Sequence, residues 1–203
     1  MSEKGASYYN KHRKRAMESL ENSPWLDVYK KALQFVPSVE SSSKIIDLGC
    51  GSGRFAKLLK MKDYTNYLGM DFAHELIKEA RRYVPGYEFV KCSVLANKAK
   101  ERFKEFDTFI LLEILEHINQ DLEVVSNIPS GSNMIFSLPN YVSKSHVRAF
   151  NNEDEVKQRY GHLIKFEDSD IWQAKRKWDH VPPSGGESVK MFSRIFIFKG
   201  VKL

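Results

Sequence analysis

The stretch that decides the fold is residues 44–55, which read KIIDLGCGSGRF. A short apolar strand, residues 44–48, runs directly into glycines at positions 49, 51 and 53, and a helical pattern follows. Glycines at alternate positions let the backbone turn tightly and approach a ligand, because no Cβ stands in the way. The N-terminus of the next helix adds free N–H groups. The stretch therefore predicts a ligand-binding loop at the carboxyl end of a strand.

Outward from this loop, strands alternate with helices. Helical spacing predicts helices over residues 75–83 and 113–125, besides the helix that follows the glycines. Apolar runs predict the strands, which lie at residues 44–48, 67–70, 87–92, 106–112 and 133–138. Such alternation is typical of parallel βαβ units with right-handed crossovers and helices on both faces of the sheet.

A last strand is expected at residues 191–199 (MFSRIFIFK), where phenylalanines alternate with other residues. A PPSGG turn precedes it, so we expect this strand to run antiparallel. Weaker patterns suggest helices at residues 152–160 and 168–174. The expected fold class is α/β, with a doubly wound, mainly parallel seven-stranded sheet, an antiparallel last strand and helices on both faces.

An acidic residue accompanies the glycine loop, since Asp71 ends the second predicted strand. A carboxylate there can accept both hydroxyl groups of a ribose in charge-assisted hydrogen bonds. A nicotinamide or flavin site favours G-x-G-x-x-G, whereas this loop reads Asp47-x-Gly49-x-Gly51-x-Gly53. That pattern resembles the first motif of class I S-adenosylmethionine (SAM)-dependent methyltransferases, and the resemblance covers residues 44–140.

The resemblance implies that the loop wraps the methionine part of SAM and that the acid after strand two holds the ribose. The family often has an acid after strand three as well, whereas this chain has Cys92 and Ser93. The cofactor-binding residues that the resemblance implies are Asp47, Gly49, Cys50, Gly51, Gly53, Asp71, Phe72, Cys92, Ser93, Leu112 and Glu113.

A second motif follows strand four, where residues 111–118 read LLEILEHI. It resembles the E-x-x-E-H stretch of small-molecule methyltransferases of the ubiquinone-biosynthesis type. On a helix, Glu113, Glu116 and His117 would share one face and could ligate Mg²⁺ or Mn²⁺, with His146 or His162 completing the set. That arrangement resembles the RNA 3′-end 2′-O-methyltransferases, which use a metal to hold the terminal ribose.

The alternative is that the stretch only borders the site, with Glu113 on the cofactor and His117 as a base or substrate contact. Residues 160–166, YGHLIKF, resemble the G-H-L segment of small-molecule members. This favours the second alternative, so we expect no metal and assign the catalytic roles to His117 and Glu113. A histidine suits proton removal near neutral pH.

The chain is expected to be one domain over residues 1–203, with an N-terminal helical lid (1–40), a cofactor-binding core (44–140) and a substrate-side region (141–203). The lid is expected as a helix over residues 8–36, broken near Pro24, with Ser23 as the N-cap of its second part. The expected substrate-binding residues are Tyr9, His12, Arg13, His146 and His162.

The 203-residue chain has a net charge of +6, two cysteines and a polar, basic N-terminus without an apolar signal region. We therefore expect a cytoplasmic protein without a disulfide framework or a membrane segment. The predicted function is SAM-dependent methyl transfer to an O or N nucleophile of a small polar metabolite. The alternatives are a metal-assisted RNA 2′-O-methyltransferase, with nucleic acid as the partner, and a non-catalytic SAM-binding protein.

Overall fold

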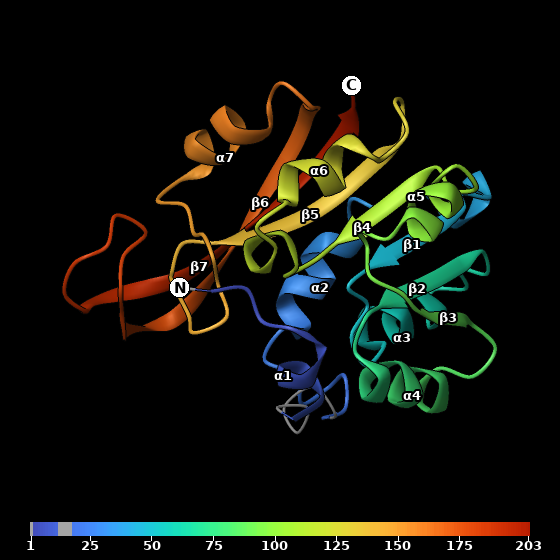
Figure 1. Ribbon diagram of the computed structural model, residues 1–203, viewed down its shortest axis with the longest axis horizontal. Helices are drawn as coiled ribbons and strands as arrows, with labels where there is room; N and C mark the ends of the chain where they lie inside the picture. Colours follow the sequence, from blue (N-terminus) through green and yellow to red (C-terminus); the bar gives the residue numbers. More distant parts are fainter. Residues whose placement is uncertain (1, 12–17) are drawn as a thin grey trace.

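The computed structural model describes residues 2–11 and 18–203, which form a seven-stranded sheet with helices on both faces (Figure 1). The strand order is β3-β2-β1-β4-β5-β7-β6. The strands are β1 (Ile45–Leu48), β2 (Tyr67–Asp71), β3 (Glu88–Lys91), β4 (Thr108–Leu111), β5 (Asn133–Pro139), β6 (Ile164–His180) and β7 (Val189–Lys202). Strands β1 to β5 pair in parallel, and β7 is antiparallel to both of its neighbours. The predicted fold class is confirmed.

Two sets of helices cover the sheet. Side chains of α2 (Leu26–Leu33), α3 (Arg54–Lys60) and α4 (His74–Tyr83) join one apolar core. Side chains of α5 (Asn97–Phe103), α6 (Asp121–Ser126) and α7 (Glu153–Tyr160) join the other. The longest described helix, α4, has ten residues, and no described helix is long and apolar enough to span a bilayer.

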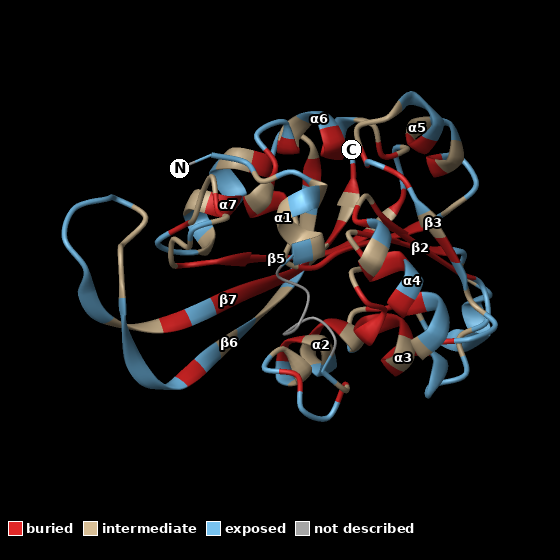
Figure 2. Cartoon of the chain, turned by 60° about the horizontal axis from the view of Figure 1, so that its bottom comes forward, coloured by how far each residue is buried: buried red, intermediate tan, exposed pale blue. Residues whose placement is uncertain are grey.

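The central strands are buried on both faces (Figure 2), as expected for parallel strands between two helical layers. Because β1, β2 and β4 are parallel and in register, with Leu48 beside Met70 and Asp47 beside Ile110, their carboxyl ends meet at one edge. The segments that follow these strands therefore lie close together, and this edge carries the candidate site.

The prediction of a helix at residues 168–174 is wrong, because these residues lie within strand β6. Strand β6 pairs with β7 over most of its length, from Ile164 opposite Lys202 to His180 opposite Val189. The pairing register shifts between Phe166 and Asp168 and again between Gln173 and Lys177. Such bulges break the alternation of inward and outward side chains, so the strand has no regular period in the sequence.

The helix expected at residues 113–125 is also wrong. Glu113 has a φ of 56°, in the left-handed region, which ends any continuation of β4 into a helix. A short 3₁₀ turn, η3 (Leu115–His117), follows, and α6 begins only at Asp121.

Within the described part of the expected helix over residues 8–36, the structure has α1 (Ala6–Lys11) and α2. Helix α2 begins at Leu26, two residues later than the sequence predicts, and its N-cap residue is Trp25 rather than Ser23. The Ser23 hydroxyl accepts a hydrogen bond from the Trp25 backbone N–H (3.2 Å), so it still supports this end of the helix.

Candidate active site

The glycine loop connects β1 to α3 through three residues with positive φ, namely Gly49 (80°), Gly51 (54°) and Gly53 (81°). The backbone N–H groups of Gly49 and Cys50 donate to the carbonyl of Met70 at 2.7 and 3.1 Å, which fixes the loop to β2. A Cβ added to Gly51 would meet no heavy atom of the described residues within 4 Å. The loop therefore has open space at its centre, where a ligand can approach the backbone.

Asp71 stands at the end of β2 beside this loop. Its Oδ2 accepts from the Gly51 N–H (3.1 Å) and its Oδ1 from the Ala73 N–H (2.8 Å). Burial raises the pKa of the carboxyl, and hydrogen bonds from the backbone of Ala73, Gly51 and Phe72 oppose the rise. Each carboxylate oxygen can accept a further hydrogen bond. Asp71 is therefore fixed in orientation and can still bind two hydroxyl groups.

Asp47 lies one strand away and is almost fully buried. The hydroxyl of Tyr67 donates to its Oδ2 at 2.8 Å. Burial raises the pKa of Asp47 to about 7, the Tyr67 hydrogen bond lowers it, and Asp71 raises it. A ligand ammonium group near this carboxylate would favour its charged form.

The segment after β3 contains the predicted adenine-side residues. The Cys92 N–H donates to the Asp71 carbonyl (2.9 Å), so residues 92–93 adjoin the end of β2. Ser93 is exposed, and its hydroxyl accepts from the Leu95 N–H (3.3 Å). Cys92 is buried, and burial raises the pKa of its thiol. Ser93 is thus the polar side chain available where the family often has an acid.

The segment after β4 packs directly on the glycine loop. A Cβ on Gly49 would fall 2.6 Å from Cδ1 of Ile114, so the two backbones approach closely there. Leu112, the residue before Glu113, is buried. The Glu113 carboxylate accepts a hydrogen bond from the Ser137 hydroxyl at 2.9 Å. Burial and the neighbouring Glu116 raise the pKa of Glu113 to about 8, while Ser137 and His117 lower it.

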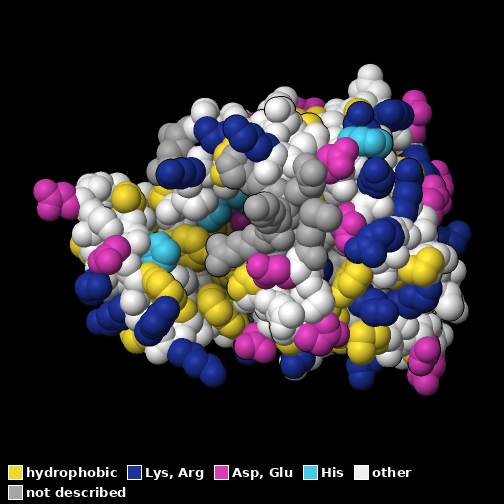
Figure 3. Space-filling model, turned by 90° about the horizontal axis from the view of Figure 1, so that it is seen from below, with side chains coloured by type: hydrophobic (Ala, Val, Ile, Leu, Met, Phe, Trp, Pro, Cys, Tyr) yellow, Lys and Arg dark blue, Asp and Glu magenta, His cyan; other side chains and the backbone are white. Residues whose placement is uncertain are grey.

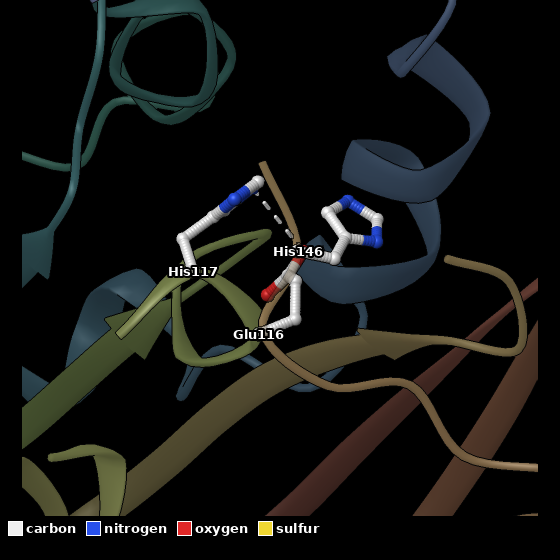
Figure 4. Close-up of side chains that lie close together, drawn as sticks. All are labelled: Glu116, His117 and His146. Carbon is white, nitrogen blue, oxygen red and sulfur yellow. Dashed lines mark ion pairs between the residues drawn. The ribbon is translucent and has the colours of Figure 1, made fainter. Parts of the chain in front are cut away.

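Beyond Glu113, three side chains converge to form what we call the carboxylate–histidine cluster, namely Glu116, His117 and His146 (Figure 4). One potential ligand atom from each lies within 4.8 Å of those of the other two. Glu116 and His117 come from η3, and His146 comes from the loop after β5. The two imidazole rings meet edge to face with centroids 4.8 Å apart. His117 Nε2 lies 3.7 Å from Glu116 Oε1.

Backbone carbonyls orient both imidazoles. Nδ1 of His117 lies 2.9 Å from the Ser145 carbonyl, and Nδ1 of His146 lies 3.0 Å from the Tyr141 carbonyl. A carbonyl oxygen can only accept, so each Nδ1 carries the proton and each neutral ring has its lone pair on Nε2. Burial lowers the pKa of His117, and burial together with the neighbouring His117 lowers the pKa of His146 to about 4. Both rings are therefore neutral at pH 7.

Helix α1 brings Tyr9 to the same place. Its ring lies 5.5 Å from that of Phe72 and 6.0 Å from that of His117, measured between centroids. The Asn10 side chain accepts from the Glu75 N–H (3.0 Å), which holds α1 on the first turn of α4. Tyr9 therefore bridges the cofactor side and the cluster. The predicted residues His12 and Arg13 lie outside the described residues.

The structure does not bring His162 to this group. It is exposed in the turn before β6, whose first residue pairs with Lys202, and the adjoining Val201 pairs with Asn133 at the start of β5. His162 therefore lies at the opposite edge of the sheet.

Sequence reasoning also missed two residues that support the site. Ser137 was signalled only by being polar within the apolar run NMIFSL. Arg148 carried no signal. Its guanidinium donates to the carbonyls of Leu115, Ile118 and Asn119, tying the loop after β5 to η3.

A family model described as "Methyltransferase domain" matches residues 46–130, which run from β1 through the glycine loop, Asp71 and η3 to the turn before β5. Over residues 46–130 the chain therefore matches the methyltransferase-domain family. This match supports a transferase of the methyltransferase class.

Solved structures agree with this methyltransferase in fold. The chain is similar to the magnesium protoporphyrin IX methyltransferase from Synechocystis PCC 6803 with bound SAM, at 15% identity and a TM-score of 0.62, covering 98% of this chain and 95% of that one. It is also similar to the N-methyltransferase NodS from Bradyrhizobium japonicum WM9 in complex with S-adenosylhomocysteine (SAH), at 15% identity and a TM-score of 0.64, covering 97% and 99%.

A third similar structure is a SAM-dependent methyltransferase, possibly a histamine N-methyltransferase, from Thermotoga maritima, at 13% identity and a TM-score of 0.60, covering 98% and 97%. At these identities the likeness concerns the fold, and the acceptors of these enzymes differ from one another. The resemblance to the ubiquinone-biosynthesis subgroup stays a prediction.

Proposed function

We propose that this methyltransferase transfers the methyl group of SAM to an oxygen or nitrogen nucleophile of a small polar acceptor. The acceptor would lie between the glycine loop and the carboxylate–histidine cluster. The observation that carries the proposal is the pair of neutral imidazoles, His117 and His146, whose Nδ1–H groups are engaged by backbone carbonyls. Their Nε2 lone pairs are free for the acceptor side of the site.

The chemistry requires little more than alignment and removal of a proton. Methyl transfer from a sulfonium is an in-line displacement in which the sulfur leaves neutral, so no general acid is needed. Asp71 and the glycine loop would fix the cofactor, which supplies the methyl group. The reaction is faster when the acceptor is held in line with that methyl group. His117 Nε2 can take the proton that the nucleophile loses.

The N-terminal segment lies over the site and favours a small acceptor. Tyr9 of α1 stands over Phe72 and His117, and Asn10 fixes this helix to α4. The carboxylate of Glu3 accepts from the Asn119 N–H at 2.8 Å, which joins the N-terminal segment to the loop after η3. A site enclosed in this way suits a small acceptor better than a long polymer.

The test is a methyl-transfer assay with labelled SAM on a cell extract separated into small metabolites, RNA and protein. We expect label in the small-metabolite fraction. His117→Gln should lower the rate by at least tenfold while SAH still binds, and Asp71→Ala should abolish both the rate and SAH binding. Label in no fraction would overturn the proposal.

A nucleic-acid acceptor is the second candidate, and the outer part of the β6–β7 hairpin favours it. The pairing of β5 with β7 ends where Pro139 lies opposite Ile195. The outer part of the β6–β7 hairpin extends from there away from the rest of the sheet (Figure 1). Its end carries the exposed Trp178, with the Arg176 guanidinium 4.0 Å from that ring's centroid.

Exposed basic side chains lie on the same part of the hairpin, and Lys and Arg side chains are visible there at the left of Figure 3. They include Lys175, Arg176, Lys177 and Lys190. The hairpin also reaches the site, because the Tyr141 ring stacks on His180 at 4.7 Å and lies 5.6 Å from His146. Stacking aromatics among basic side chains suit single-stranded nucleic acid. Label in the RNA fraction, lost in Trp178→Ala, would support this candidate against the first.

A further inference from the structure

The side chain that the methyl-transfer chemistry leaves unexplained is Glu116. It is fully buried, and neither carboxylate oxygen has a hydrogen-bond partner among the described residues. Leaving a buried polar group unpaired costs free energy, and a charged one costs more. A carboxylate can only accept hydrogen bonds, and each of its oxygens can accept more than one. The position of Glu116 therefore favours a ligand that brings hydrogen-bond donors and a positive charge.

The arginine beside Glu116 is engaged elsewhere. Arg148 pairs with Asp121 at 2.9 Å and donates to three backbone carbonyls of η3 and the residues after it. Its charge lowers the pKa of Glu116, but burial has the larger effect and raises that pKa to about 8. Arg148 therefore does not supply the hydrogen bonds that the buried carboxylate lacks.

The two imidazoles beside Glu116 present acceptors as well. Because both Nδ1–H groups donate to backbone carbonyls, the Nε2 atoms of His117 and His146 carry lone pairs. His117 Nε2 lies 3.7 Å from Glu116 Oε1, and the three side chains converge in Figure 4. Three acceptors thus gather at one place, and each of them needs a donor from a ligand.

The spacing of the cluster suits a nitrogen that carries several protons. One nitrogen or carboxylate oxygen of each residue lies within 4.8 Å of those of the other two. Acceptors at a hydrogen-bond distance of about 2.9 Å from one tetrahedral nitrogen are about 4.7 Å apart, because its N–H bonds diverge. An alkylammonium group offers three such donors, as lysine does, whereas a hydroxyl offers one and would leave two acceptors unpaired.

The charge of the surroundings also favours a cation over an anion. Glu113 lies close enough to Glu116 for their charges to repel, which adds to the raised pKa of Glu113. The Tyr9 ring, 6.0 Å from that of His117, provides an aromatic neighbour of the kind that attracts cations. A positively charged ligand would let both carboxyl groups ionise, whereas an anionic one would be repelled by them.

We propose that the acceptor is a small primary amine, held between the Glu116 carboxylate and the Nε2 atoms of His117 and His146, and that its nitrogen receives the methyl group. This inference rests on the function proposed above and narrows the nucleophile from oxygen or nitrogen to nitrogen. The two Nε2 atoms keep the role toward the acceptor that the proposed function gives them, and Glu116 supplies the charge that selects an amine.

The proton and electron pairs balance in this arrangement. The bound ammonium gives one proton to His117 Nε2, which leaves a lone pair on the nitrogen. That lone pair forms the bond to the methyl carbon while the bond from this carbon to sulfur breaks and its electron pair goes to sulfur. The nitrogen is then a cation again, and the Glu116 carboxylate stabilises the charge as it develops. His117 afterwards releases its proton to solvent.

Amine binding is tested first, because it does not depend on turnover. Butylamine, butanol and butyrate, which are similar in size, are titrated calorimetrically into the full chain saturated with SAH at pH 7, where an alkylamine is protonated. EDTA is present throughout, so that metal ions do not contribute. We expect saturable binding of butylamine, at least tenfold tighter than that of butanol or butyrate. Equal affinity for butylamine and butanol, or no binding of butylamine, would overturn the amine site.

Variants locate the amine. Glu116→Gln keeps the shape of the side chain but removes its charge, so it should weaken butylamine binding at least tenfold. His146→Gln should weaken it at least threefold. The control, Glu101→Gln, removes an exposed carboxylate of α5 and should change nothing. SAH affinity and the thermal midpoint report whether each variant is folded. Undiminished butylamine binding in a folded Glu116→Gln or His146→Gln variant would overturn the site.

The labelled assay tests whether the amine is the methyl acceptor. The labelled small metabolites are passed over a cation exchanger at pH 7 and then treated with mild alkali, which removes methyl groups from esters but not from amines. We expect the label in a cationic, alkali-resistant product, formed at least tenfold more slowly by Glu116→Gln. Label only in neutral or anionic products, or only in RNA, would overturn the amine acceptor and keep methyl transfer. A chain that binds butylamine but labels nothing would overturn the proposed function and keep the amine site.

Discussion

Ser137 on β5 and Glu113 after β4 are joined by two hydrogen bonds through one hydroxyl group. The Glu113 N–H donates to Ser137 Oγ, and that hydroxyl donates to Oε1 of Glu113, both at 2.9 Å. The φ of 56° at Glu113 is unfavourable for a residue with a Cβ, so the turn needs such support. A neighbouring strand thus sets the direction in which the chain leaves β4 toward Glu116 and His117.

Replacing Ser137 by alanine should therefore disturb η3 more than the cofactor side. Ser137 is fully buried, so the variant leaves the Glu113 N–H without its acceptor and should cost about 1–3 kcal/mol of unfolding free energy. We expect kcat to fall at least tenfold while the Kd for SAH changes less than threefold. Ser130→Ala, which removes an exposed hydroxyl that donates to Leu203, is the matched control and should change neither quantity. A kcat equal to wild type would contradict the supporting role of Ser137.

Replacing Gly51 or Gly69 by alanine should affect different properties, SAH affinity in the first case and stability in the second. A Cβ at Gly51 enters open space in the loop, so Gly51→Ala should weaken SAH binding at least tenfold and cost about 1–2 kcal/mol for the positive φ. A Cβ at Gly69 would lie 2.5 Å from the Phe89 ring and 2.9 Å from Cys50 Sγ. Gly69→Ala should therefore lower stability by about 1–3 kcal/mol or more through overpacking.

Calorimetric titration with SAH and a thermal melt of each variant distinguish the two effects. The variants should rank in opposite order by affinity loss and by stability loss. If Gly51→Ala bound SAH as tightly as wild type, the open space at Gly51 would not be the ligand site.

Asp47 should make the ligand-free protein less stable as the pH rises. Burial raises its pKa to about 7, so the folded state binds a proton that the unfolded state has lost above about pH 4. Stability from this group is complete below pH 4 and declines until the pH passes 7. Asp47→Asn removes the titrating group while leaving an oxygen to accept from Tyr67.

Urea unfolding of both proteins without cofactor at pH 4 to 8 checks this dependence. The variant's free energy of unfolding relative to wild type should increase with pH and reach a gain on the order of 4 kcal/mol at pH 8. Other buried carboxyls titrate in both proteins, so only the difference between them is diagnostic. A difference that does not change with pH would show that Asp47 titrates normally.

Asp121 at the start of α6 should be the most costly acidic residue to lose. It is fully buried and receives hydrogen bonds from Arg159 (2.7 and 2.8 Å) and from the Tyr160 hydroxyl (2.6 Å), and it pairs with Arg148. Removing one partner of a buried ion pair strands the other, so Asp121→Ala should cost about 3–5 kcal/mol.

The control is Glu123→Gln in the same helix, where the lost pair with Lys100 is partly exposed and should be worth less than about 1 kcal/mol. Chemical denaturation gives both values. Equal losses for the two variants would contradict the importance of burial here.

The cofactor half of the molecule could be predicted from the sequence because its signals are local. The glycines that need positive φ, the strand before them and Asp71 at the end of the next strand all lie within 30 residues, and parallel strands bring their carboxyl ends together by rule. The same local logic predicts the last strand, β7, from its alternating phenylalanines, and its antiparallel direction from the PPSGG turn before it.

Predictions that assumed a regular period beyond these strands were wrong. Glu113 was expected on a helix, but its left-handed turn depends on Ser137, which is 24 residues further along the chain. Residues 168–174 were expected to be helical, but pairing with β7 makes them strand in spite of their bulges. In both places a contact between distant segments outweighs the local preference.

The sequence by itself therefore determined the parallel strands, the glycine loop and the position of Asp71 beside it, because short-range backbone geometry and burial decide those. Only the tertiary structure decided which histidine joins Glu116 and His117. His146 and His162 are equally plausible by residue type, but the loop after β5 returns to η3 through backbone hydrogen bonds, while the turn before β6 lies at the far edge. Contacts of this kind between distant loops depend on how whole helices and strands pack, and no local sequence pattern encodes them.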